Sequence, residues 1–126
     1  MSADFKISKS IFMQIADNIC SQILEGTLKP EERVPSIRDL ASDFEVNSNT
    51  VLRSYTILSD AGVIENKRGI GFFVTGDAEQ KIRERKRTEF FKTDLPEFIS
   101  KVQLLKLNKN DLNDLFNVIE FQTNKK

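Results

Sequence analysis

The side chains best suited to chemistry are amides, hydroxyls and cations that gather in two short stretches of the chain. One stretch holds Ser48, Asn49 and Arg53, and the other holds the adjacent cations Lys67 and Arg68. The amide of an asparagine can bond an adenine edge at two points, and arginine and lysine neutralise phosphates. Residues of these types are suited to contact with a DNA duplex, and they are not residue types that commonly make or break covalent bonds.

The residues on which most catalytic and metal sites depend are missing. The chain has no histidine, and Cys20 is its one cysteine. This excludes Ser-His and Cys-His nucleophile pairs as well as structural zinc, and we expect no cofactor and no enzyme activity. The 19 acidic residues are scattered along polar faces, which leaves a carboxylate enzyme as a remote alternative. Cys20 lies on an apolar helix stripe, which indicates a small buried residue rather than a reactive thiol.

Length and composition favour a small cytoplasmic protein. The 126 residues, 39% hydrophobic and 30% charged, suffice for one modest domain or a small domain with an appendage. No apolar run approaches the roughly 18 residues of a membrane span, and residues 1–10 lack the pattern of a signal peptide. A single cysteine fits a reducing compartment.

Two helices are predicted in the first third of the chain. Isoleucines recur every four residues over 11–25 and form an apolar stripe, and Gly26 is a natural stop. After a loop, Ser36 and Asp39 fit a capping box for a second, short helix that ends near Phe44.

A third helix is predicted after a tight turn. Asn47 is a good N-cap for a helix over 48–61, and Tyr55 lies on its apolar inner face. The outer face is mostly polar and contains Ser48, Asn49, Leu52, Arg53 and Thr56. A short helix, a tight turn and a helix that is apolar on one side only predict a helix-turn-helix.

A hairpin is predicted directly after the third helix. Strands over 63–67 and 70–75 enclose a turn at Lys67-Arg68-Gly69, and Gly71 follows where a hairpin needs positive φ. A hairpin in this position is a wing. Its tip carries two cations for which the hairpin itself has no structural need.

The remainder of the chain predicts helices with a large apolar surface. Pro96 is expected to kink a helix or start a new one, and Asn108 with Asp111 fits the cap of a last helix. Five of the ten phenylalanines lie from Phe90 onward. Two helices cannot bury this surface alone, so we expect the tail to form a dimer.

The expected fold class is mainly α (α+β), with a winged helix-turn-helix over 1–76 and an all-α dimerisation tail over 77–126. In its motifs the chain resembles the GntR-type winged-helix regulators. The matching blocks, which occur in the family's order, are IFMQI at 11–15, ILEGTLKP at 23–30, VPSIRDLA at 34–41, VNSNTV at 46–51, GVI at 62–64 and GIGFFV at 69–74. They cover about half of the chain.

The resemblance implies a DNA-binding transcription regulator, with repression as the expected action. A tail of about 50 residues is similar to that of the YtrA-like subgroup, in which two helices serve dimerisation and no effector domain is present. The implied complex is a homodimer on a palindromic operator in double-stranded DNA. The third helix would enter the major groove and the wing the minor groove, and no effector is assigned.

The resemblance also implies roles for individual residues. Arg38 matches an arginine that contacts phosphate or base at the start of the second helix, where a capped N-terminus favours phosphate. Residues 47–50 match the first turn of the recognition helix, and residues 67–71 match the wing. The expected DNA-binding set is Ser36, Arg38, Asn47, Ser48, Asn49, Thr50, Arg53, Lys67, Arg68, Gly69 and Gly71.

Two positions depart from the family pattern. Many relatives carry arginine where this chain has Ser48 and Leu52, so guanine reading there is not expected. Adenine bonding by Asn49 and a thymine-methyl contact by Leu52 predict an A/T-leaning half-site. The missing cations, together with equal totals of 19 basic and 19 acidic residues, keep one alternative open. That alternative is a winged helix that serves as a protein-interaction module.

Overall fold

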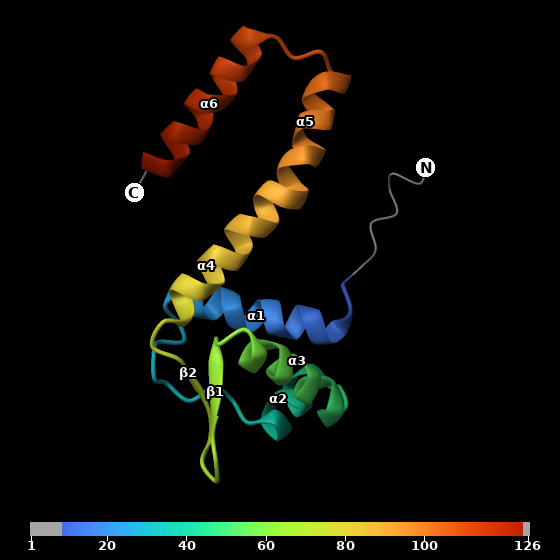
Figure 1. Cartoon of the computed structure of the whole chain (residues 1–126). Helices are drawn as coiled ribbons and strands as arrows, with labels where there is room; N and C mark the ends of the chain where they lie inside the picture. The colour runs from blue at the N-terminus through green and yellow to red at the C-terminus, as the bar shows by residue number, and fades with distance from the viewer. Residues whose placement is uncertain (1–8, 125–126) are drawn as a thin grey trace. The chain divides into compact units, whose positions relative to one another are not determined.

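Six α-helices, one π-helical turn and a two-stranded sheet make up the computed structural model over the described residues, 9–124 (Figure 1). Their order is α1 (Ile11–Glu25), α2 (Ile37–Phe44), α3 (Ser48–Asp60), β1 (Ile64–Lys67), β2 (Gly71–Val74), α4 (Ala78–Glu89), η2 (Phe90–Asp94), α5 (Leu95–Leu104) and α6 (Lys109–Asn124). The expected fold class is confirmed, and α3 ends at Asp60 rather than residue 61. The signal-peptide expectation falls largely on residues 1–8, which lie outside the described residues.

The first compact unit, within residues 1–85, is built around α3, which contacts α1, α2 and β1. Its core consists of Ile15, Ala16, Ile19, Ile23, Val34, Leu40, Ala41, Val51, Tyr55, Leu58, Val63, Ile64, Val74, Ala78 and Ile82. Cys20 is half-buried against this cluster. The unit ends later than the boundary expected after residue 76, because Ala78 and Ile82 on α4 are buried in the core.

Side-chain caps set the starts of α2 and α3. Ser36 Oγ accepts a hydrogen bond from the Asp39 amide at 3.0 Å. The return bond of a capping box, from Asp39 to the Ser36 amide, is not formed among the described residues. Asn47 Oδ1 accepts from the Asn49 amide at 2.7 Å. Between the helices, Glu45 adopts the left-handed region with φ 55°, which ends α2 and turns the chain toward α3.

The predicted hairpin is confirmed. β1 and β2 pair antiparallel, with Lys67 opposite Gly71 as the last pair before the turn, and the Ile70 amide donates to the Lys67 carbonyl at 2.8 Å. Gly69 has φ 79° and Gly71 has φ 146°, conformations that L side chains rarely adopt.

A further segment pairs with the other edge of β2, where the sequence indicated only a loop. The Val34 amide donates to the Phe72 carbonyl at 2.9 Å, and the Val74 amide donates to the Glu32 carbonyl at 2.8 Å. Arg33 forms an isolated antiparallel bridge with Phe73. The wing is therefore braced along both edges of β2.

The second compact unit, residues 86–126, exposes many of its apolar side chains to solvent. None of its described residues is buried. Those that are large, hydrophobic and exposed are Phe90, Phe91, Phe98, Ile99, Leu104, Leu105, Leu112, Phe116, Val118, Ile119 and Phe121. No described helix has the length and apolar character needed to cross a bilayer.

Two expected helix signals in this unit are confirmed. Pro96 is the second residue of α5, a helix that begins directly after the π-helical turn η2. A proline lacks the amide hydrogen and clashes with the carbonyl four residues earlier, which a wider turn relieves. At α6, the Asn108 amide donates to Asp111 Oδ2 at 3.0 Å, and the Asp111 amide donates to Asn108 Oδ1 at 2.9 Å.

Candidate nucleic-acid interface

The first turn of α3 presents polar side chains to solvent. Ser48 and Asn49 are exposed, whereas Thr50 is half-buried. The Asn49 backbone amide is bonded by Asn47, but the side-chain amide of Asn49 has no hydrogen bond to any described residue. Leu52, one turn on, is 46% exposed. This turn can therefore offer one donor–acceptor amide and one apolar contact to a ligand.

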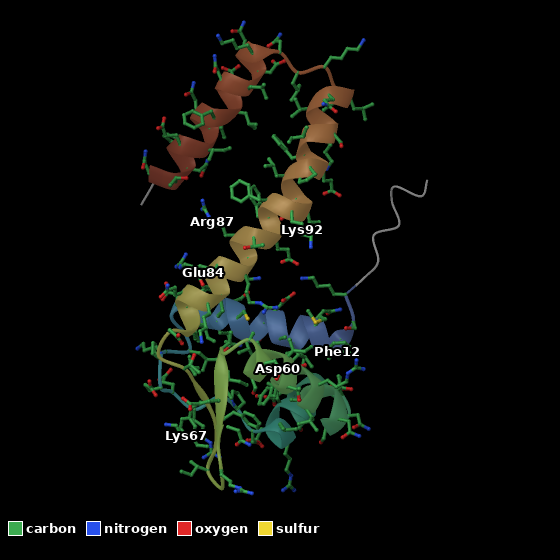
Figure 2. All side chains as sticks on the ribbon, viewed as in Figure 1. Phe12, Asp60, Lys67, Glu84, Arg87 and Lys92 are labelled. Carbon is green, nitrogen blue, oxygen red and sulfur yellow. The ribbon has the colours of Figure 1, made fainter. Side chains whose placement is uncertain are left out.

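Arg53, farther along α3, is exposed but held in place. Its guanidinium carbon lies 4.0 Å from the centroid of the Phe12 ring, which projects from α1 near the N-terminal end of that helix (Figure 2). The neighbouring Ser54 is fully buried, and its hydroxyl donates to the Phe12 carbonyl at 2.7 Å. Phe12 thus contacts α3 through both its ring and its backbone, and it orients the cation.

The opposite face of α3 fixes the helix in the core. Tyr55, expected to be a core residue, is fully buried, and its hydroxyl donates to the Pro35 carbonyl at 2.5 Å. Its ring meets the Phe72 ring edge-on, with the centroids 5.0 Å apart. Burial raises the pKa of Tyr55 to about 12. One side chain therefore ties α3 to the segment before α2 and to the wing.

The start of α2 contributes one available cation. Arg38 is exposed and forms no ion pair with a described residue. Ser36 is half-buried, and its oxygen is already engaged in the cap of α2. The side chains of Ser36 and Asn47 therefore cap helices by accepting hydrogen bonds from backbone amides. The side chains of Arg38 and Asn49 are exposed to solvent instead.

The wing carries the second basic group. Lys67 and Arg68 are exposed at the end of the hairpin, and Figure 2 shows Lys67 on the wing. The Lys67 ammonium lies 4.6 Å from the centroid of the Phe73 ring. The ion pairs of the described part of the chain involve Lys9, Lys81 and Arg83, and none involves a cation of the expected site.

Sequence reasoning missed three residues of this surface. Phe12 was considered only as part of the motif at 11–15, although its ring supports Arg53. The ring of Phe73 supports Lys67. Arg33 belongs to a segment that was predicted to be a loop, and its side chain lies over Gly71. The alternation Glu32-Arg33-Val34, with Val34 buried, is the signal that could have indicated a strand-like edge there.

The arrangement of α1, α2, α3 and a two-stranded hairpin defines a winged helix-turn-helix. Residues 12–74 match the family described as bacterial regulatory proteins, gntR family. The chain therefore belongs to the GntR family, as its motifs predicted.

Relatives and a solved structure agree with this assignment. The chain is 32% identical to the HTH-type transcriptional regulator YhcF of Bacillus subtilis, over 89% of this chain and 91% of YhcF. It is 35% identical to the HTH-type transcriptional repressor YtrA of the same organism, over 68% of this chain and 65% of YtrA. The crystal structure of a transcriptional regulator described as GntR family, from Bacteroides thetaiotaomicron, matches with a TM-score of 0.76 at 36% identity. That match covers 91% of this chain and 100% of the other.

Proposed function

We propose that this chain is a sequence-specific DNA-binding transcriptional repressor. The observation that carries the proposal is the first turn of α3, where the unbonded amide of Asn49 and the exposed Leu52 project from a helix whose other face is buried. A helix held in this way can enter a major groove with its N-terminal side chains on base edges. Asn49 would bond an adenine and Leu52 would contact a thymine methyl, giving an A/T-leaning half-site.

Phosphate contacts supply most of the affinity in this proposal, and four cations would make them. Arg38 lies at the start of α2, Arg53 on α3, and Lys67 and Arg68 on the wing; all four are exposed. The wing tip, with its glycines at 69 and 71, would reach the adjacent minor groove. Local cations of this kind are sufficient even though the net charge of the chain is zero.

A homodimer supplies the second half-site. The second unit exposes Leu104 at 80%, Leu105 at 66% and Phe116 at 62%, and none of its described residues is buried. Apolar surface of this extent is characteristic of an interface, and a two-fold dimer matches a palindromic operator. Occupation of such an operator would block a promoter, and the name of YtrA as a repressor supports that action.

A gel-shift titration at two salt concentrations tests the proposal, with duplexes selected from a random pool and a scrambled duplex as comparison. A protein that contacts many phosphates should lose on the order of 10³-fold in affinity between about 50 and 200 mM salt. The selected duplex should also bind more tightly than the scrambled one. If neither duplex binds at low salt, the proposal is wrong and the alternative, a protein-interaction module, is favoured.

A further inference from the structure

The wing sheet has an outer face that carries two cations. Successive side chains of a strand alternate between faces, so Phe72 and Val74 point to the core while Gly71 and Phe73 lie on the outer face. Lys67 is paired with Gly71, and Arg33 is bridged to Phe73. Both cations therefore belong to the outer face.

The two cations reach over β2 from its opposite edges, Lys67 from β1 and Arg33 from the segment before α2. Lys67 reaches diagonally to the Phe73 ring, with its ammonium 4.6 Å from the ring centroid. Arg33 reaches diagonally to Gly71, where a Cβ would lie 2.7 Å from Arg33 Nε and 3.0 Å from Arg33 Nη2. The absence of a side chain at Gly71 therefore gives the guanidinium its place on the sheet, at the first strand pair behind the wing turn.

The hydrogen-bonding capacity of Arg33 is not used within the described protein. Arg33 is exposed and makes no hydrogen bond or ion pair with a described residue. The carboxylates next to it in sequence are directed elsewhere: Glu32 Oε1 accepts from the Lys29 amide at 2.7 Å, and Glu31 Oε2 lies 3.2 Å from the Cβ position of Gly76. Glu65, which also shares the outer face through its pairing with Phe73, forms no ion pair with a described residue.

Like charges on one surface repel each other, and an anion bound between them offsets this repulsion. A guanidinium offers five donors in a planar fork that suits phosphate oxygens, and an ammonium adds a point charge. On this wing, Arg33 and Lys67 are positioned by the sheet rather than by a carboxylate, and Arg68 adds a third cation at the adjoining turn. The combination fits a phosphate of a DNA strand that borders the groove entered by the wing.

We propose that Arg33 is a further phosphate-binding residue and that Arg33 and Lys67 together bind one backbone phosphate on the outer face of the wing. This inference rests on the proposed DNA-binding function. It adds to the interface a segment before α2, and it gives Gly71 a second role beyond the geometry of the turn.

The test compares Arg33→Gln, Arg33→Lys and Lys101→Gln in the full chain. Lys101 lies on α5 in the second unit and controls for the loss of one positive charge. The dependence of log affinity on log salt concentration is measured for a selected duplex and for a scrambled duplex. Loss of a phosphate contact should lower the slope by about 1 per bound subunit and weaken both duplexes alike.

Arg33→Gln should show this reduced slope, Arg33→Lys should retain most of the wild-type slope, and Lys101→Gln should retain all of it. A wild-type slope in Arg33→Gln overturns the inference, and so does weaker binding with an unchanged slope, which would mean that Arg33 only supports the wing. Thermal unfolding of each variant checks that the wing remains folded. If the wild-type chain binds neither duplex, the proposed function fails together with this inference, whereas a failure confined to Arg33→Gln leaves DNA binding intact.

Discussion

The guanidinium of Arg53 on α3 lies 4.0 Å above the ring of Phe12 on α1. The contact joins two helices that are far apart in sequence, and it holds a long side chain that would otherwise sample many rotamers. A cation ordered before its ligand arrives loses less conformational entropy on binding. Phe12 is thus a positioning residue for Arg53, which is one of the proposed phosphate contacts.

Replacement of Phe12 by leucine should release Arg53. A cation–π contact at an exposed site contributes roughly 0.5–1 kcal/mol, so Phe12→Leu should weaken duplex binding about two- to fivefold. Phe12→Tyr keeps the ring and serves as the control. Fluorescence anisotropy gives the affinity, and the ring-current shift of the Arg53 δ protons reports the stack. Wild-type affinity in a Phe12→Leu chain that has lost this shift would contradict the positioning role.

The amide of Asn49 should determine one base position. Because this side chain has no hydrogen bond within the described protein, Asn49→Ala should leave folding stability nearly unchanged. It should cost roughly 1–3 kcal/mol in binding, confined to one position of the half-site. Affinities for a set of duplexes with single base changes give the profile.

Asn47→Ala is the matched control for Asn49→Ala. It removes the cap of α3 and should lower the free energy of unfolding by about 1 kcal/mol without shifting base preference. An equal loss on every duplex for Asn49→Ala would show that this residue does not read bases.

Tyr55 should make stability depend on pH above about 10. Its pKa is raised to about 12 in the folded protein, whereas an exposed tyrosine ionises near 10. The contribution of the protonated Tyr55 side chain to the free energy of unfolding is therefore fully present below pH 10. It is lost as pH rises toward 12, at up to about 1.4 kcal/mol per pH unit.

Tyr55→Phe should remove this dependence and should cost about 1 kcal/mol at neutral pH through the lost bond to Pro35. Urea unfolding across this pH range measures both effects as the difference between the two proteins. Tyr55 is the one tyrosine of the chain, so tyrosinate absorbance reports its ionisation directly. A constant difference from pH 8 to 12 would show that burial does not hold the proton.

The apolar face of α6 should control oligomeric state. Ile119 is 55% exposed, so Ile119→Asp should not disturb a core, but it would place a charge in the proposed dimer interface. We expect the variant to sediment as a monomer where the wild type sediments as a dimer. Asn117→Asp adds the same charge on the opposite side of the helix and should remain dimeric. A dimeric Ile119→Asp chain would remove this face from the interface.

The fold was largely predictable because its signals are local. Isoleucine spacing, the caps at Ser36 and Asn47 and the glycines of the wing each act within a few residues, and each placed its element correctly. The contacts of Arg33 and Phe12 could not be predicted, because they join segments distant in sequence. Gly71 was expected for its turn geometry, but its contact with Arg33 depends on the pairing of residues 31–34 with β2.

The caps of α2 and α3 separate the residues that build the structure from those that would read DNA. The side-chain oxygens of Ser36 and Asn47 accept hydrogen bonds from backbone amides. Asn49 and Leu52 are exposed and contribute little to folding stability. In the proposed complex, substitutions at 48, 49 and 52 would therefore change the preferred operator at small cost in stability. If these positions read DNA as proposed, the chain would suit the engineering of specificity, because the exchangeable positions follow a fixed cap.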